Sequence, residues 1–138
     1  MFRDMPITYH IDSARQLVTV RASGRVTYRD VVLYYRDLRA SLASHPLLSE
    51  LADLREVSGA EITASEISSL ANMAVFGATA KRALVTQSDL VYGLCRMFIA
   101  YSSFNAEHNI SVFHEMEEGR RWLELDDSPE AESIRIAS

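Results

Sequence analysis

The sequence predicts an α/β fold with a five-stranded mixed sheet, one antiparallel edge strand and about four helices. Apolar and polar residues alternate over 7–11 and again over 17–22, which predicts two strands that end before Gly24. From Thr27 onward, helical apolar repeats alternate with short apolar runs. Because a strand, helix, strand alternation makes successive strands parallel, only the first strand is expected to run antiparallel.

The first helix is expected over 27–44. Thr27 and Asp30 have the spacing of a capping box, in which the side chain of each residue accepts a hydrogen bond from the backbone amide of the other. The helix is expected to end before Pro46, because the residue that precedes a proline disfavours helical torsion angles.

A buried strand over 48–54, a loop over 55–62 and a second helix from Thr63 form the segment around which the chain is organised. The short apolar run is typical of a strand covered on both faces. Thr63 and Glu66 form a second capping box. The helical apolar repeat then extends toward Gly77, a residue suited to a helix C-terminus. The loop therefore leads into a helix N-terminus, where free amides favour ligands and regulatory chemistry.

The third helix, expected from Ser88 to Tyr101, is apolar over nearly its whole circumference. Arg96 is the only charged residue between Leu90 and Tyr101. A helix with this pattern is buried on more than one side. We therefore expect its additional face to contact another helix, a ligand or a second subunit, and we predict a homodimer through this helix.

The remaining elements complete the predicted sheet. Apolar runs at 83–85 and 110–113 predict the fourth and fifth strands, and a short helix that Trp122 docks onto the sheet follows. Residues 1–125 are expected to form a single domain, since their length and composition are ordinary for one. The polar segment 126–138 is expected to be a disordered tail.

Composition argues against several classes of protein. The net charge of −5 does not suit a nucleic-acid-binding protein, which carries a basic surface. A single cysteine cannot form an intrachain disulfide and is typical of a reducing compartment. No apolar segment has the length of a signal-sequence core or of a membrane span. We expect a cytoplasmic protein that does not span a membrane.

Several local motifs resemble those of one family. They are Gly24-Arg25-Val26-Thr27 before the first helix, Ala52-Asp53-Leu54 in the central strand, Tyr92-Gly93-Leu94-Cys95-Arg96-Met97-Phe98 in the third helix, and Val112-Phe113 followed by Glu118-Gly119-Arg120-Arg121-Trp122-Leu123. In this order they resemble the SpoIIAA-like family of small bacterial proteins, which is related to the STAS fold of anti-sigma factor antagonists and similar to the CRAL-TRIO lipid-binding fold. The resemblance covers residues 6–124 and implies a SpoIIAA-like fold.

The resemblance also implies a regulatory mechanism at the start of the second helix. Regulatory STAS proteins carry an Asp-Ser-Ser or similar motif just before this helix, and phosphorylation of one serine changes a protein partnership. The matching positions here are Glu61-Ile62-Thr63-Ala64, so the motif is absent and only Thr63 could be the phospho-acceptor. Thr63 has two interpretations. It is a structural helix cap, or it accepts a phosphate that would meet helix amides but also Glu56 and Glu61.

The third helix contains the second candidate site, formed by Tyr92, Arg96, Met97 and Tyr101. Aromatic and methionine stripes are usually packing, so the first interpretation is a core and dimer interface. The alternative is an apolar pocket between the second and third helices, in which Arg96 would hold an acidic head group. Small residues on the facing helix would leave space for a lipid-like ligand: Ala71, Ala74, Gly77 and Ala78.

No catalytic or metal-binding pattern stands out. The four histidines are scattered and lack the spacing of zinc ligands. Asp53, Glu56, Glu61 and Glu66 match no metal-binding loop and are interpreted as a solvated acidic rim. No glycine-rich phosphate loop and no pair of nucleophile and base can be named. The sequence therefore predicts neither an enzyme nor a metal or cofactor site.

Two functions remain. The first is a non-enzymatic binding or regulatory module that contacts a protein partner through the loop from Glu56 to Thr63 and the adjacent helix. The alternative is binding of an apolar or lipid-like small molecule near Arg96. An exposed apolar patch near Ile62 would favour the first function, and an enclosed apolar cavity would favour the second.

Overall fold

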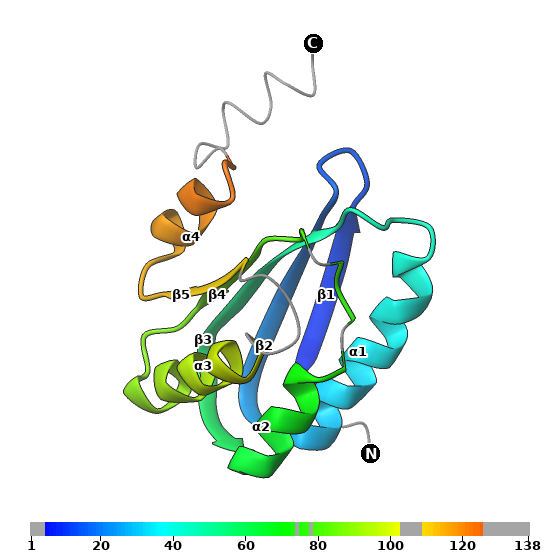
Figure 1. Ribbon diagram of the computed structural model, residues 1–138. Helices are drawn as coiled ribbons and strands as arrows, with labels where there is room; N and C mark the ends of the chain where they lie inside the picture. The colour runs from blue at the N-terminus through cyan, green and yellow to red at the C-terminus, as the bar shows by residue number, and fades with distance from the viewer. Residues whose placement is uncertain (1–4, 74, 78, 103–108, 126–138) are drawn as a thin grey trace.

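The computed structural model describes residues 5–125 except 74, 78 and 103–108 (Figure 1). Within these residues, five strands form one sheet in the order β1-β2-β3-β4-β5. The strands are β1 (Ile7–Asp12), β2 (Leu17–Thr27), β3 (Ser49–Glu61), β4 (Arg82–Val85) and β5 (Ile110–Phe113). The helices are α1 (Tyr28–Leu42), α2 (Ala64–Ala71), α3 (Asp89–Ser102) and α4 (Met116–Trp122). Only β1 is antiparallel to its neighbour, so the predicted mixed α/β sheet with a central β3 is confirmed.

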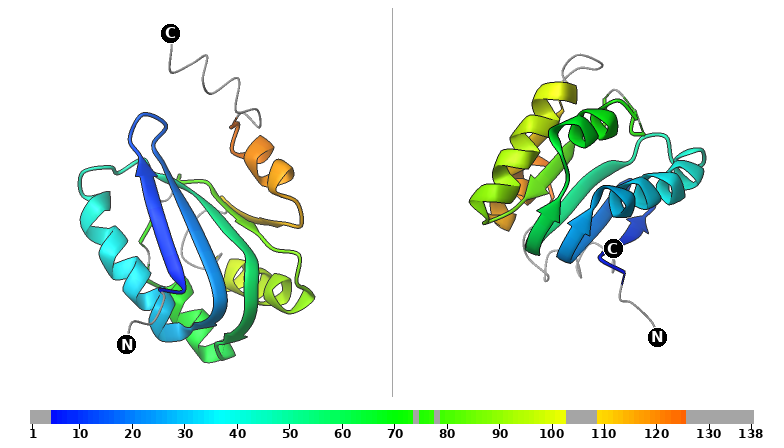
Figure 2. Two further views of the ribbon diagram at one scale, coloured as in Figure 1. Left: turned by 180° about the vertical axis from the view of Figure 1, so that it is seen from behind. Right: turned by 90° about the horizontal axis from the view of Figure 1, so that it is seen from below.

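The sheet is covered unequally on its two faces. α1, α2 and α3 each connect two neighbouring parallel strands and lie on one face (Figure 2, right). Right-handed crossovers that step in the same direction place their helices on the same side of a sheet. α4 packs on the other face, where the ring of Trp122 lies 5.7 Å from that of Phe113. None of the helices in the described residues covers β1 and β2 on this second face (Figure 2, left).

Both predicted capping boxes are confirmed. Thr27 precedes α1, and its amide donates to Asp30 Oδ2 at 2.9 Å while the Asp30 amide donates to Thr27 Oγ1 at 3.3 Å. Thr63 precedes α2, and the corresponding distances to Glu66 are 2.9 and 3.1 Å. The sequence thus determines where both helices begin, because each box satisfies amides that a helix N-terminus leaves free.

The prediction that β2 ends before Gly24 is wrong. Gly24 adopts a positive φ of 69°, and β2 continues through it to Thr27. A glycine tolerates this backbone conformation without steric cost, so the strand kinks and does not stop.

The loop predicted at 55–62 is also incorrect, because β3 extends to Glu61. This part of β3 pairs with the extended β2, and the last pair of the ladder is Thr27 with Glu61. The local sequence Ser58-Gly59 suggests a turn, but the hydrogen bonds to β2 hold it extended. Only Ile62 separates the end of β3 from the Thr63 cap.

α2 ends at Ala71, well before the predicted end near Gly77. Asn72 is responsible: its side-chain Nδ2 donates to the Ser68 carbonyl at 2.9 Å, and its backbone amide donates to the same carbonyl at 3.1 Å. Such a side-chain bond to the backbone competes with continuation of the helix. Two of the small residues proposed to face a pocket, Ala74 and Ala78, lie outside the described residues, as does the predicted tail at 126–138.

α3 has one buried stripe in the single chain, formed by Val91, Cys95 and Phe98. Its opposite side is exposed, and Leu90 is 60% accessible to solvent. Among the described residues only this one stripe of α3 is buried, so burial of the helix on a second side stays a prediction.

Candidate functional site

The outer half of β3 is irregular. From Arg21 to Ser23, β2 advances by two positions, while its partner β3 advances by three, from Asp53 to Glu56. A second shift follows, because Gly24 pairs with Val57 but the next residue, Arg25, pairs with Gly59. Each shift is a β-bulge with one additional residue in β3. Bulges of this kind redirect side chains and occur beside functional sites.

Beyond Asp53, β3 has a neighbouring strand on one side only. β4 pairs with 50–53, whereas β2 continues to pair as far as Glu61. Within the described part of the chain, the backbone of 54–61 therefore has an edge without a strand partner on the β4 side. We call residues 54–61 the outer segment of β3. It lies directly before α2, toward which β3 curls (Figure 1).

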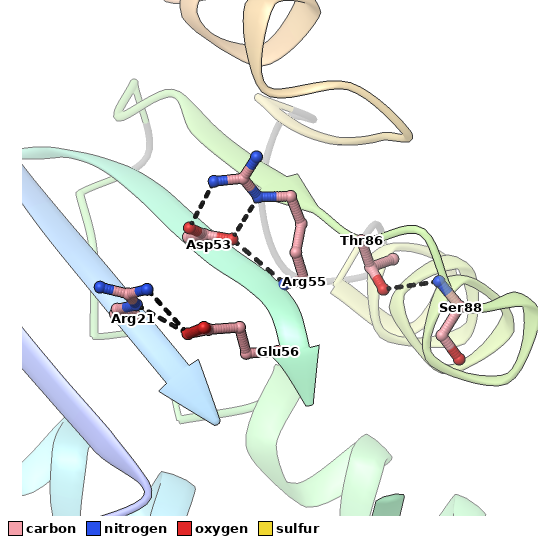
Figure 3. Close-up of polar contacts among 6 residues, drawn as sticks. All are labelled: Arg21, Asp53, Arg55, Glu56, Thr86 and Ser88. Carbon is pink, nitrogen blue, oxygen red and sulfur yellow. Dashed lines mark hydrogen bonds and ion pairs between the residues drawn. The ribbon is translucent and has the colours of Figure 1, made fainter. Parts of the chain in front are cut away.

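Ion pairs tie the outer segment to β2. Arg21 Nη2 lies 2.8 Å from Glu56 Oε2, as drawn in Figure 3, and Arg25 Nε lies 2.7 Å from Glu61 Oε1. All four side chains are more than half exposed. Exposed ion pairs stabilise a fold only slightly, so these two pairs form a charged rim that contributes little to stability. The acidic rim expected from sequence is neutralised in part by these two arginines.

Asp53 and Arg55 form a second polar unit on β3. Arg55 donates to Asp53 through Nε and Nη2, both at 2.9 Å (Figure 3). The side-chain hydrogen bonds from Arg55 hold the pKa of Asp53 below its usual range. Asp53 also accepts from the Arg55 backbone amide at 3.1 Å, so it stabilises the first bulge.

The residues predicted at the regulatory site lie together. Glu56 and Glu61 are exposed on the outer segment, and Thr63 is exposed at the N-terminus of α2. Ile62 is partly buried and lines a cavity in the core. Whether these residues bind a partner or accept phosphate stays a prediction.

The residues predicted at the α3 site do not converge. The Tyr92 ring stacks on His114 of the β5 end, with centroids 4.4 Å apart. Met97 and Tyr101 pack against the main core, and Arg96 is exposed. None of the four is among the residues that line the cavity. A ligand held by Arg96 stays a prediction.

A cavity of about 140 Å³ lies between the sheet and the three helices α1, α2 and α3. Its apolar wall includes Ala22, Ala52, Leu70, Leu84 and Phe98. Leu54, Val57, Ala60 and Ile62 line it as well, so the outer segment of β3 has one side on the cavity and the other on solvent.

Four polar side chains of the core meet at the cavity wall. Arg82 Nε donates to Glu50 Oε1 at 2.9 Å, and Tyr34 donates its hydroxyl to Glu50 Oε2 at 2.7 Å. Arg82 Nη2 donates to the Tyr35 hydroxyl at 3.0 Å, and the guanidinium lies 4.2 Å from the Phe76 ring centroid. A buried ion pair needs such additional hydrogen bonds to offset desolvation.

Burial controls the ionisation of this cluster. Burial alone would lower the pKa of Arg82, but the neighbouring Glu50 carboxylate raises it above its usual value. Burial, with Glu50 in second place, raises the pKa of the Cys95 thiol to about 12. Arg82 is thus a permanent cation, and Cys95 is a neutral thiol at physiological pH.

Sequence analysis missed the Glu50–Arg82 pair. A signal exists in retrospect, because Glu50 directly precedes the apolar pair Leu51-Ala52 and Arg82 directly precedes the apolar run Ala83-Leu84-Val85. Charged residues inside apolar strands are rarely buried unless they are paired.

The described residues include no candidate metal site and no candidate membrane span. Among them, no group of three or more His, Cys, Asp or Glu side chains is arranged to hold a metal ion. None of the helices in this part of the chain is both long and apolar enough to cross a bilayer.

Known proteins resemble this chain in structure and not in sequence. No family model and no curated protein matches it. An uncharacterized DUF3478-family protein with a SpoIIAA-like fold from Shewanella loihica aligns with a TM-score of 0.59 and 19% identity, over 89% of this chain and 98% of its own. The anti-sigma factor antagonist SpoIIAA, in its unphosphorylated form, aligns with a TM-score of 0.57 and 14% identity, over 87% of this chain and 100% of its own. The protein therefore has a SpoIIAA-like α/β fold, as the sequence motifs implied.

Proposed function

We propose that the protein is a non-enzymatic regulatory module of the cytoplasm, which binds a protein partner through the outer segment of β3, the Thr63 cap and α2. The observation that carries this proposal is the edge of β3 beyond Asp53, which has no strand neighbour on the β4 side among the residues that the structure describes. Such an edge offers backbone hydrogen bonds to an extended segment of a partner. The two bulges twist the edge and so limit pairing with unrelated chains.

The likeness to SpoIIAA supports a regulatory role. That protein is an anti-sigma factor antagonist, and its structure is described for an unphosphorylated form. Here Thr63 is exposed at the N-terminus of α2, where helix amides would favour a phosphate. Arg25 Nε already forms an ion pair with Glu61 Oε1 at 2.7 Å, so a phosphate on Thr63 would compete with Glu61 for this arginine.

Photocrosslinking tests the partner surface. A photoreactive amino acid is placed at Ser58, which is exposed in the outer segment, and at Arg36 as a control, which is exposed on α1. We expect a discrete adduct from Ser58 in the native cell and none from Arg36, and we expect charge reversal of Glu56 to weaken the adduct. Equal adducts from both positions, or none from Ser58, would contradict the proposal.

A second candidate function is binding of a small apolar molecule. The core cavity is the observation that favours it, because its wall is apolar apart from the paired Glu50 and Arg82 and their two tyrosine partners. Ligand sites of this kind are largely formed before the ligand binds.

Homodimerisation through α3 remains part of the proposal. Leu90 is 60% exposed and Arg96 lies on the same exposed side of the helix. Sedimentation of wild type, Leu90→Lys and Leu47→Lys tests it, since Leu47 is 68% exposed but lies outside α3. We expect a wild-type dimer that only Leu90→Lys dissociates. A monomeric wild type at high concentration would refute the dimer.

A further inference from the structure

The size of the core cavity limits what can occupy it. Its volume is about 140 Å³. An engineered apolar cavity of ~150 Å³ binds benzene, whereas pockets for drug-sized ligands measure about 300–1,000 Å³. The cavity therefore fits a molecule of about one aromatic ring and cannot enclose a fatty acyl chain with its head group.

The charges in the cavity wall limit the ligand further. A buried arginine facing an apolar space would ordinarily favour a carboxylate ligand. Here the Glu50 carboxylate already occupies that role, with its oxygens 2.9 Å from Arg82 Nε and 2.7 Å from the Tyr34 hydroxyl. Glu50 is 2% exposed, so its charge is not screened by water. Because Glu50 and Arg82 already neutralise each other, a ligand of either charge would lose its water in the cavity without gaining a free counterion.

Small side chains keep the space open. Ala22 of β2 and Ala52 of β3 line the cavity, and both are almost fully buried. The larger residues around them are held in place, since Tyr34 and Tyr35 are anchored through their hydroxyls to Glu50 and Arg82. Such anchoring hinders the collapse that would otherwise fill a cavity.

We propose that this cavity binds a small uncharged molecule, largely apolar and about the size of one aromatic ring, with the Glu50–Arg82 pair excluding charged ligands. The inference rests on the second proposed function and specifies its ligand. A ligand here would contact Val57 and Ala60 of the outer segment of β3. Glu56 and Ser58, on either side of Val57, are exposed to solvent. A ligand in the cavity would therefore contact the same strand that forms the proposed partner surface.

Fluorine NMR on the full chain tests the proposal with three probes: fluorobenzene, 4-fluorobenzoate and a fluorinated long-chain fatty acid. We expect fluorobenzene to bind in the millimolar range and roughly tenfold or more tighter than 4-fluorobenzoate, and we expect no fatty-acid binding. If the fatty acid or the benzoate binds best, the inference is overturned while small-molecule binding stands. If no probe binds, both the inference and the second proposed function fail.

Two pairs of variants locate the site. Ala22→Ile places bulk in the cavity, whereas Thr19→Ile places it on the exposed side of the same strand. We expect only Ala22→Ile to abolish fluorobenzene binding, and loss in both or in neither would overturn the assignment.

Glu50→Gln frees the buried arginine and is expected to gain benzoate binding, while the double variant Glu50→Gln with Arg82→Met is not. A folded Glu50→Gln that still rejects benzoate would overturn the charge argument. If this variant does not fold, the wild-type affinities for fluorobenzene and 4-fluorobenzoate test the charge argument instead.

Discussion

Glu50 and Arg82 occupy paired positions on β3 and β4, and their side chains form a 2.9 Å ion pair inside the core. The charge of each residue thereby offsets most of the desolvation cost of burying the other residue. The pair connects the two central strands to α1 through Tyr34 and Tyr35.

Breaking this pair from one side should be strongly destabilising. Arg82→Met leaves the Glu50 carboxylate buried without its cation, and we expect it to lower the free energy of unfolding by about 3–5 kcal/mol. Replacing both residues, by Glu50→Leu with Arg82→Met, should lower it by much less than the sum of the single changes. Urea denaturation of the four proteins in a double-mutant cycle measures this coupling. Additive single effects would show that the pair is not coupled.

The Thr63 cap should contribute to stability whether or not it is ever phosphorylated. Thr63→Ala removes the oxygen that accepts from the Glu66 amide at 3.1 Å, and we expect a loss of about 1 kcal/mol. Thr63→Ser keeps this hydroxyl and should retain most of the stability. Thermal denaturation compares the three proteins. A Thr63→Ala protein as stable as wild type would argue against the cap as the main structural role of this residue.

Alkaline pH should destabilise the protein through Cys95. The pKa of this thiol is raised to about 12 in the folded state, whereas an unfolded chain releases the proton near pH 8.5. Between these values the unfolded state binds fewer protons, so the free energy of unfolding falls as pH rises, by about 1.4 kcal/mol per pH unit. Burial raises the pKa values of Tyr34 and Tyr35 too, so they add a fall of the same sign above about pH 10.

Cys95→Ala isolates the contribution of the thiol. The substitution should lower stability at neutral pH by lost packing, yet give a flatter decline between pH 9 and 11 than wild type, by about 1.4 kcal/mol per pH unit. Urea denaturation across this range provides both curves. Parallel curves for the two proteins would mean that the thiol does not titrate on unfolding as described.

Two helical glycines should respond oppositely to alanine. A Cβ on Gly119 of α4 would lie 3.0 Å from Val85 Cγ2, so Gly119→Ala forces α4 away from the sheet and should destabilise by about 1–3 kcal/mol. A Cβ on Gly93 of α3 meets nothing within 4 Å, so Gly93→Ala should stabilise by up to about 1 kcal/mol. Chemical denaturation of both variants tests the pair. A destabilising Gly93→Ala, or a Gly119→Ala as stable as wild type, would contradict this prediction.

The elements that could be predicted from sequence are those with local signals. Thr27 and Thr63 mark the starts of two helices because a capping box needs only residues three apart. The loop predicted over 55–62 is wrong because pairing with β2 holds this segment extended, and the sequence of one strand does not reveal its partner.

The candidate site was only partly predictable for the same reason. Glu56, Glu61 and Thr63 are neighbours in the chain and so were found together. Glu50 and Arg82 are 32 residues apart, and only the register of β3 with β4 brings them into contact. Arg96 is the only charged residue between Leu90 and Tyr101, which made it a candidate site residue in the sequence, yet its side chain is exposed.

The most direct measurement for the proposed partner surface is residue-resolved hydrogen exchange of the β3 amides, with and without the partner identified by crosslinking from Ser58. In the free protein we expect slow exchange at 51–53, which pair on both sides, and faster exchange within 55–60. Addition of the partner should slow exchange within 55–60 and at the start of α2. Unchanged exchange there, with new protection on α1 or on the face under α4, would contradict the proposed surface.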